Sequence, residues 1–431
     1  MVLIPQVGRL GLAVTGCLGW LLTSMSAGAA GAEPLDVQSF WQSPSETAAL
    51  SVIRDAFRER GGVWADFPTE NFQQNRRLAF QRIIEGIPPF GLQWHAGYEL
   101  RAMSDSGAIL DLTSIAEGME WSGFLDPSVL DYLGDDGSVF ALPVGIHGEN
   151  WAWFNTPLLH RYADAVPETW GDLEAVLNRA AADGAPGIAM GTQAWQRRIL
   201  FSHILIGEGG AGLLRDLLGA GGPSLLYRAA FRRALSIYAS LRTYDIRDPS
   251  TQSWEDGIRA VARGEALVQF MGDWARAELA ILELEPGRDF ECALSIGPAK
   301  HHFSIIDTFV FPRRDYGGPT NGHRTFAEAV LDPRTQVAFS KAKWAIPVRT
   351  DLASHIVDPC VRKGYDLYVT TNGSVPSSMM VAQERSIAAL EAVLSDFWDN
   401  EAATVDDGIL ALRAVLRAGT MADHLVGQGL E

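Results

Sequence analysis

The sequence predicts an α/β protein with two lobes, on two observations. Short runs with the alternating pattern of β-strands are interleaved with amphipathic segments that begin at capping residues and end at glycine. About 400 residues remain after the N-terminal leader is set aside, which exceeds one hydrophobic core, so we expect two lobes of roughly 150–250 residues each. The hydrophobic content of 47% is that of an ordinary globular chain.

Residues 1–32 have the composition of a secretory signal peptide. A single charge at Arg9 precedes an apolar stretch and the small residues Ala30-Gly31-Ala32, which suit cleavage before Glu33. A second interpretation takes "VTGC" as a lipobox and Cys17 as a lipidated N-terminus. That cut would leave the apolar "LGWLL" outside the leader, so we favour the signal peptide. No later stretch has the roughly 18 apolar residues of a membrane span, and we expect an exported, soluble, periplasmic protein.

The charge and the cysteine count narrow the function classes further. The formal net charge is −17, and removal of Arg9 with the leader makes it −18, which disfavours binding to nucleic acid and to anionic lipid. Two cysteines, Cys292 and Cys360, remain in the mature chain. An even count in an oxidising compartment predicts one disulfide between them, and two buried free thiols are the alternative.

The first predicted strand lies in "LDVQSFWQSPSE", residues 35–46, where Leu35, Val37 and Ser39 alternate with their neighbours. This strand ends on Trp41, a Ser-Pro-Ser turn and Glu46. An aromatic ring and a carboxylate at a strand end serve no hydrophobic core, so we expect another role for Trp41 and Glu46.

The remaining elements follow from periodicity, caps and glycine stops. Helices are predicted from Ala49 to Phe57 before Gly61-Gly62, over 75–86 before Pro88-Pro89, over 167–184 and over 404–419. In the third helix Thr169 is the N-cap and Asp172 stands at N3, with Leu173, Val176, Leu177, Ala180 and Ala181 on the buried face and Gly184 as the stop; the fourth repeats this plan with Thr404. Residues 90–97 predict a strand that runs into a loop, and residues 136–155 a turn and a long extended stretch interrupted at Pro143.

Sequence motifs for catalysis, metal binding or cofactor binding are missing. The chain has no G-x-S-x-G, no H-E-x-x-H, no glycine-rich phosphate loop and no C-x-x-C, so we expect no catalytic residue, cofactor or metal site. His301 and His302 are adjacent, which is the wrong spacing for one metal on a helix, and we interpret them as solvated loop residues. A glycosidase pair such as Glu46 with Asp307 stays open.

Tryptophans stand beside polar residues at predicted strand ends and in loops, and the chain has 13 of them. A sugar presents apolar C–H faces to aromatic rings, and hydroxyls to carboxylates, amides, Lys and His. Trp41, Trp94, Trp254 and Trp274 have such neighbours, and we favour a binding role for Trp41 and Trp274, which adjoin a turn and a carboxylate. We assign Trp64, Trp170, Trp195 and Trp398 to the core.

Seven stretches make the chain resemble the type-1 extracellular solute-binding proteins of ABC importers, most closely the glucose/mannose-binding branch. They cover nearly the whole mature chain: "FWQSPSE", "LQWHAGYEL", "DGSVFALPVGIHGENWAWFN", "PETWGDL", "WEDGIRAVARGEALVQFMGDWA", "DTFVFP" and "FSKAKWAIPVR". The segment from Trp254 to Trp274, with its terminal Gly-Asp-Trp, is the most specific. The resemblance implies a clamshell of two discontinuous lobes around a monosaccharide, which an ABC permease receives from a monomeric receptor without catalysis or a cofactor.

The resemblance also implies roles for individual residues. Ligands bind at strand carboxyl ends in open α/β sheets, where Trp41 would stack on the sugar and Glu46 would accept from its hydroxyls. Further hydroxyl contacts would come from Gln93 and His95, aromatic surface from Trp254 and Trp274 of the opposite lobe, and the rest of the polar ring from Asp307 and Lys343.

Three positions depart from the family pattern. Phe40 stands where a second Trp is usual, Lys343-Trp344-Ala345 stands where Lys-Gly-Ser is common, and Met380 stands where a hydroxyl-binding His follows Val-Pro-Ser. Because Met cannot donate a hydrogen bond, we expect Met380 to line the pocket and to change the hydroxyl pattern that is accepted.

The lobes are expected at 33–146 plus 300–345 and at 147–299 plus 346–431. The chain would cross between them at Val144–His147, at Gly297–Lys300 and near Pro347, and these crossings would form the hinge. A same-fold receptor for a disaccharide, a glycoside or a polyol, and a secreted carbohydrate-active enzyme, are the alternatives.

Overall fold

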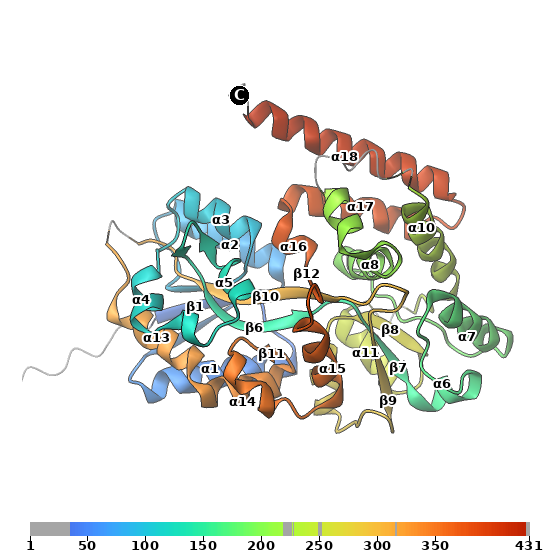
Figure 1. Ribbon diagram of the computed structural model, residues 1–431, viewed down its shortest axis with the longest axis horizontal. Helices are drawn as coiled ribbons and strands as arrows, with labels where there is room; N and C mark the ends of the chain where they lie inside the picture. The colour runs from blue at the N-terminus through green and yellow to red at the C-terminus, as the bar shows by residue number, and fades with distance from the viewer. Residues whose placement is uncertain (1–34, 219–225, 227, 249–251, 315–316, 428–431) are drawn as a thin grey trace, which may run out of the picture. The chain divides into compact units, whose positions relative to one another are not determined.

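A computed structural model describes residues 35–218, 226, 228–248, 252–314 and 317–427, and the predicted signal peptide lies outside these ranges. The two principal sheets are the seven-stranded and the three-stranded sheet of Figure 1, with helices packed on both. No helix of the described ranges combines the length and the apolar character that crossing a membrane requires.

The seven-stranded sheet runs in the order β11-β6-β10-β3-β1-β2, and β12 also pairs with β10. Its strands are β1 (Leu35–Ser39), β2 (Trp64–Pro68), β3 (Gly91–His95), β6 (Leu142–Gly148), β10 (His302–Val310), β11 (Ile346–Pro347) and β12 (Ser374–Pro376). Strand β1 is parallel to both β2 and β3, which the crossover helices between these strands permit, whereas β10 is antiparallel to both β3 and β6. The carboxyl end of β3 therefore lies beside the middle of β10.

The three-stranded sheet is antiparallel, in the order β8-β7-β9. It consists of β7 (Trp151–Asn155), β8 (Val268–Met271) and β9 (Phe290–Leu294), and a separate hairpin consists of β4 (Gly134–Asp135) and β5 (Ser138–Val139). The extended stretch predicted over 136–155 thus supplies strands to three sheets, and it passes from the large sheet to the smaller one between Gly148 and Trp151.

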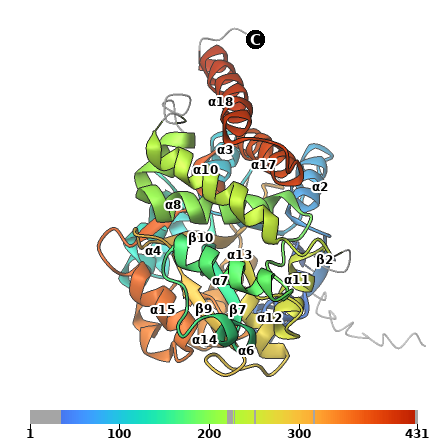
Figure 2. The same ribbon diagram turned by 90° about the vertical axis from the view of Figure 1, so that its right-hand side faces the viewer.

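Helices pack on both sheets, and some of them form a separate group above the sheets in Figure 1. They are α1 (Pro44–Glu59), α2 (Phe72–Ile84), α3 (Tyr98–Asp105), α4 (Thr113–Gly118), α5 (Pro127–Leu130), α6 (Thr156–Tyr162), α7 (Trp170–Ala182), α8 (Ala194–Leu218), α10 (Ala229–Leu241), α11 (Trp254–Ala262), α12 (Ala275–Ile281), α13 (Asn321–Leu331), α14 (Pro333–Lys343), α15 (Pro359–Tyr368), α16 (Ser378–Val381), α17 (Glu384–Asp399) and α18 (Val405–Gly427). Helices α8, α10, α17 and α18 pack on one another (Figures 1 and 2). Helix α8 is interrupted at Gly210, whose φ of 69° is not helical.

The caps expected from the sequence are present. Thr169 and Asp172 form a reciprocal capping box at the start of α7, and Thr404 and Asp407 make the same bonds before α18. Leu173, Val176, Leu177 and Ala180 are buried as predicted, but Ala181 is exposed because α7 ends one residue later and presents that side to solvent.

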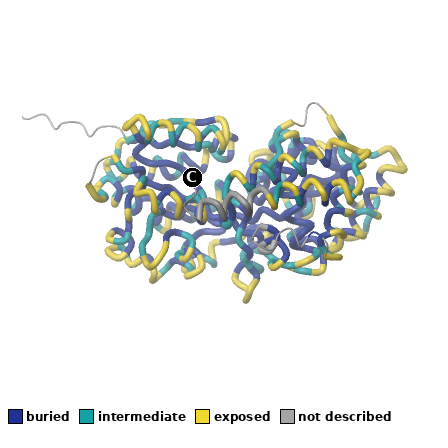
Figure 3. Tube along the Cα trace, turned by 90° about the horizontal axis from the view of Figure 1, so that it is seen from above, coloured by how far each residue is buried: buried dark blue, intermediate teal, exposed yellow. Residues whose placement is uncertain are grey.

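Every residue of β6, β7, β8 and β10 is buried, and buried residues are drawn dark blue along the chain in Figure 3. One hydrophobic cluster surrounds the seven-stranded sheet, and two others surround the three-stranded sheet and the helices on it. Ile346, Val348 and Ile356 fall in the range 346–431 that was assigned to the second lobe, but they belong to the hydrophobic cluster of the large sheet. Residues 34–431 form one compact unit, and the lobe boundaries and hinge stay a prediction.

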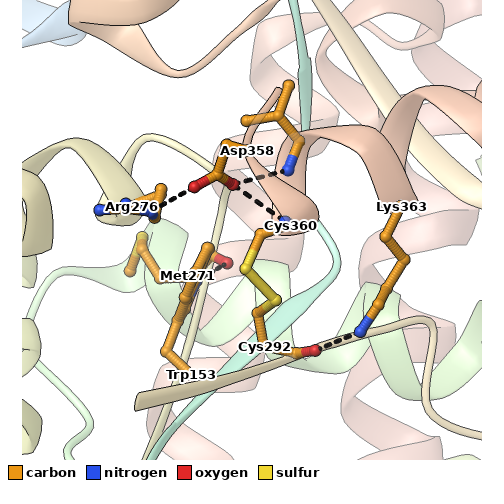
Figure 4. The surroundings of a disulfide bond; sticks show 8 residues. Trp153, Met271, Arg276, Cys292, Asp358, Cys360 and Lys363 are labelled. Carbon is orange, nitrogen blue, oxygen red and sulfur yellow. Dashed lines mark hydrogen bonds and ion pairs between the residues drawn. A yellow bond between two sulfur atoms is a disulfide. The ribbon is translucent and has the colours of Figure 1, made fainter. Parts of the chain in front are cut away.

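The predicted disulfide between Cys292 and Cys360 is confirmed, with 6.1 Å between the two Cα atoms. It joins β9 to the first turn of α15 (Figure 4), where Asp358 caps the helix and accepts a hydrogen bond from buried Arg276. The interpretation of His302 as a solvated residue is wrong. Its side chain is buried on β10, where Nδ1 lies 2.7 Å from the Ser304 hydroxyl and burial lowers its pKa to about 3.

Candidate functional site

A cavity of about 190 Å³ opens where the carboxyl ends of β1 and β3 meet β10 and the first turns of α8 and α11. This volume has room for several water molecules and hence for a small polar ligand. The described residues that line it are Phe40, Trp41, Gln42, Glu46, Glu70, Asn71, Phe72, Gln73, His95, His147, Glu149, Gln193, Trp195, Arg198, Trp254, Glu255, Trp274, Ile305, Asp307, Lys343, Met379 and Glu391.

Strand pairing brings Asp307 between two histidines. Asp307 is the cross-strand partner of His95 on β3, and Ile305 is the partner of His147 on β6. The Asp307 carboxylate lies 3.4 Å from His95 Nε2 through one oxygen and 3.3 Å from His147 Nε2 through the other. The side chain of His147 is buried, whereas that of His95 keeps 15% of its surface exposed at the cavity.

His147 also contacts a second carboxylate. Its Nδ1 lies 2.5 Å from Asp273, whose other oxygen accepts a hydrogen bond from the Gly148 backbone N–H at 2.7 Å. Burial lowers the pKa of His147, but the charges of Asp273 and Asp307 outweigh it and raise the pKa to about 9. His147 is therefore an imidazolium at neutral pH.

The pKa of His95 shifts in the other direction, because burial outweighs the nearby charges. Burial lowers the pKa of His95 despite the nearby Asp307, so its imidazole is neutral at pH 7. The pKa of Asp307 lies below its usual value because the bond and charge of His147 outweigh the effect of burial. The cavity wall thus holds an ionised carboxylate between a neutral and a charged imidazole.

The segment Gly272-Asp273-Trp274 explains how one short turn supplies two parts of the site. Asp273 fixes His147, and the Trp274 ring lies over Gly272, where a Cβ atom would come 2.2 Å from the ring. Only glycine leaves room for the ring in that position. Trp274 then lines the cavity beside His147 and Trp195, with ring centroids 5.8 and 6.4 Å away.

Glu46 has a structural task as well as a place at the cavity. One carboxylate oxygen accepts from the backbone N–H groups of Gln42 and Ser43 and completes a capping box on α1. The other accepts from Lys343 Nζ at 2.8 Å. Within the polar ring expected from the sequence, the Lys343 ammonium therefore contacts Glu46, whereas Asp307 contacts the two histidines.

Trp41 lies at the cavity but is buried. Only 2% of its surface is exposed, because Phe339 packs against it and the Lys343 ammonium lies 5.1 Å from its ring centroid. The expectation that Trp41 serves no core is wrong. Of the two tryptophans assigned to binding, Trp274 is the one with a partly open surface.

The remaining tryptophans divide between core and cavity. Trp64, Trp170 and Trp398 are buried as expected, and Trp94 is buried against Phe72 and Phe80. Trp254 is 7% exposed and lines the cavity from the first turn of α11. The assignment of Trp195 to the core is wrong, because the first turn of α8 holds it at the cavity, partly buried.

Two residues expected at the ligand do not line the cavity. Gln93 is fully buried, and its side-chain oxygen Oε1 accepts from the Ser39 hydroxyl and the Phe40 N–H, so it fixes the end of β1. Met380 is 2% exposed, and its backbone lies so close to Gly97 that a Cβ there would come 2.2 Å from the Met380 carbonyl oxygen. Its side chain packs in the core, and Met379 takes the place at the cavity.

Sequence reasoning missed a buried ionic group on the opposite wall. Arg198 on α8 donates to Glu391 on α17 at 2.9 Å and lies 3.5 Å from Glu149, which also accepts from the Ser377 hydroxyl. The two carboxylates raise the pKa of Arg198 despite burial. Charged residues inside the apolar stretches around positions 147–149 and 198 were the available signal, since such residues are rarely buried without a partner.

Comparison with known proteins gives a consistent result. The family described as "Bacterial extracellular solute-binding protein" matches residues 48–310. A "Probable sugar-binding periplasmic protein" of Mesorhizobium japonicum is 27% identical over 403 residues, which cover 90% of this chain and 94% of the relative. One of the same description from Rhizobium meliloti is 28% identical over 387 residues, covering 89% and 92%.

Solved structures share the fold. The bacterial solute receptor AcbH, described as having an exclusive preference for β-D-galactopyranose, superposes with a TM-score of 0.76 at 14% identity, over 90% of this chain and 99% of the receptor. A Thermus thermophilus maltotriose-binding protein superposes with a TM-score of 0.69 at 14% identity, over 90% and 100%. At this identity the likeness shows the fold, which is the two-lobed fold expected from the sequence.

Proposed function

Since the chain belongs to the bacterial extracellular solute-binding protein family, we propose that it is a periplasmic receptor that binds a sugar in this cavity and delivers it to an ABC importer. One observation carries the proposal: aromatic rings and hydrogen-bonding side chains surround the same small cavity. Trp254 and Trp274 offer rings to the apolar faces of a sugar, and Asp307, His95 and Lys343 offer acceptors and donors to its hydroxyls. Descriptions of the relatives as sugar-binding support the same ligand class.

The ligand that the cavity favours is a monosaccharide, with a glucose or mannose type of ring as the first candidate. Its volume of about 190 Å³ and the burial of Trp41 by Lys343 leave a compact space. A longer sugar is the alternative, since related folds include a maltotriose-binding protein and a chitin oligosaccharide binding protein. In either case Phe40 and Met379, not Met380, supply apolar surface at the rim.

The rest of the transport role follows from the same proposal. The leader directs export, the mature protein acts as a monomer without a cofactor, and the two lobes at 33–146 plus 300–345 and 147–299 plus 346–431 close around the ligand. The permease then distinguishes the closed form from the open one, as expected for a receptor whose ligand shifts a two-state equilibrium.

A thermal-shift screen of monosaccharides, disaccharides and polyols tests the proposal. A ligand at 100 times its Kd stabilises the protein by roughly 2.7 kcal/mol, which is a readily measured shift. Calorimetry with Asp307→Asn should show weaker binding, because charged hydrogen bonds contribute roughly 1.5–3 kcal/mol each. The proposal would be contradicted if none of the sugars stabilised the protein.

The same samples separate a receptor from an enzyme. A labelled oligosaccharide incubated with the protein should be recovered intact, because Glu46 is held by Lys343 and by its helix cap, and Asp307 by two histidines. Cleavage that Glu46→Gln abolishes would favour the glycosidase alternative instead.

A further inference from the structure

The charges that line the cavity do not balance. Among the described residues the lining holds six carboxylates, namely Glu46, Glu70, Glu149, Glu255, Asp307 and Glu391. It holds three cationic groups, namely Arg198, Lys343 and the protonated His147. The wall therefore carries a net charge of about −3 at neutral pH, which a cationic ligand would offset.

The ion pairs show where the excess lies. Lys343 contacts Glu46, His147 contacts Asp307, and Arg198 is shared by Glu149 and Glu391. Glu70 and Glu255 have no cation within 4.0 Å among the residues that the structure describes. Glu70 is exposed at the rim, but Glu255 is partly buried beside Trp254.

Burial makes the position of Glu255 unfavourable for a carboxylate in the absence of a cation. Loss of solvent raises its pKa, and the nearby charge of Glu46 acts in the same direction, which outweighs the opposing effects of the Glu255 backbone N–H, the Ser253 side chain and the charge of Arg259. Its place in the first turn of α11 offers some compensation from the helix dipole, yet Asp256 already completes the capping box there with Ser253. Asp256 thus completes the capping box, and the Glu255 side chain lines the cavity.

The surrounding rings suit a cation as well as a sugar. Trp195, Trp254 and Trp274 line the same cavity, and Trp41 already contacts a cation, the ammonium of Lys343, at 5.1 Å from its ring centroid. An ammonium near the face of a Trp ring is attracted by the ring quadrupole, and the attraction increases when water is excluded. The helix N-termini of α1 and α11 do not favour a further anion here, because each already holds the carboxylate of its capping box, Glu46 or Asp256.

We infer that the preferred ligand is a sugar that carries a protonated amine, with the ammonium placed between Glu255 and the tryptophans around it. This inference rests on the proposed sugar-binding function and names the substrate class of the same site. The amine would supply the positive charge that the wall lacks, while the hydroxyls would contact Asp307, His95 and Lys343.

Calorimetry at pH 7 and low salt with matched sugars tests the inference. The probes are glucose, its 2-amino and 6-amino derivatives, and N-acetylglucosamine, which keeps the nitrogen but not the charge. We expect at least one amine to bind tenfold or more tightly than both neutral sugars, with an advantage that decreases as salt is added. Equal or tighter binding of the neutral sugars would overturn the inference and leave the proposed function intact, and binding of none of them or of other sugars would remove both.

Two charge variants locate the ammonium. Glu255→Gln should lower the affinity for the amine about tenfold and leave that for glucose unchanged, because only the charge contact is lost. Glu328→Gln is the matched control, since it removes one carboxylate from α13, whose residues do not line the cavity. An equal loss for both sugars in Glu255→Gln would overturn the assignment. Preferential binding of putrescine, a cation without a sugar ring, would contradict the sugar class.

Discussion

The backbone N–H and the hydroxyl of Ser45 both donate to one carboxylate oxygen of Glu278, at 3.2 and 2.7 Å. Both residues are buried. Ser45 lies in the first turn of α1, which packs beside the seven-stranded sheet, and Glu278 lies on α12, which follows β8 of the three-stranded sheet. A charged hydrogen bond therefore joins the two halves of the core next to the cavity.

Replacement of Ser45 by Ala should weaken ligand binding about tenfold. The variant lacks the hydrogen bond from the Ser45 hydroxyl to Glu278, which joins α1 to α12 beside the cavity and is worth roughly 1.5–3 kcal/mol. Calorimetry with the best sugar of the screen measures this loss. Ser51→Ala is the control, since the Ser51 hydroxyl donates only to the Thr47 carbonyl within the same helix. Unchanged affinity in Ser45→Ala would mean that the contact is independent of the ligand.

Trp41→Ala should destabilise the protein by about 3–5 kcal/mol, because a buried aromatic side chain is removed from a packed core. Urea unfolding monitored by circular dichroism gives the change in the free energy of unfolding. Trp274→Ala should cost less, since that ring is only partly buried. The reverse order of the two losses would contradict the assignment of Trp41 to the core.

Stability should decrease as the pH rises from about 6.5 through 9. The pKa of His147 is about 9 in the folded protein, above the 6.5 of an unperturbed His, so protonation favours folding. The contribution, on the order of 3 kcal/mol, is complete below pH 6.5 and is lost as the imidazolium deprotonates near pH 9. Unfolding curves across this range measure it, and a His147→Gln variant should show a flatter profile. If the stability of the variant decreased with pH as steeply as that of the unmodified protein, other groups would cause the decrease.

Reduction of the disulfide should lower the free energy of unfolding by about 4 kcal/mol, as expected for a loop closed by cysteines 68 positions apart. Thiol titration of the denatured, unreduced mature protein should find no free thiol, and a Cys292→Ser, Cys360→Ser double variant should reproduce the loss. Two titratable thiols would contradict the bond.

The sequence was sufficient for elements whose signals are local. The capping box of Thr169 with Asp172 depends on residues three apart, and an oxidising compartment with two cysteines leaves a single pairing. Most of the residues that the resemblance assigned to the ligand do line the cavity, and their ligand contacts stay a prediction; they are Trp41, Glu46, His95, Trp254, Trp274, Asp307 and Lys343.

The partners of these residues were harder to predict, because they depend on register between distant strands. Whether Lys343 contacts Glu46 or Asp307 is decided by how α14 lies against α1, and the burial of Trp41 follows from the same packing. Gln93 and Met380 were misplaced for a related reason. Side chains alternate between the two faces of β3, and Gln93 lies on the buried face. In the short helix α16 a shift of one residue places Met379 at the cavity and Met380 in the core.

The position of β10 in the sheet has a consequence for the order in which the chain can fold as it is made. This strand lies between β3 and β6 and also pairs with β12, so residues 302–310 join segments that are synthesised long before and after them. Until it is added, β3 and β6 each keep an unpaired edge, which is where extended chains tend to associate with one another. An N-terminal fragment that stops before His302 is therefore expected to aggregate.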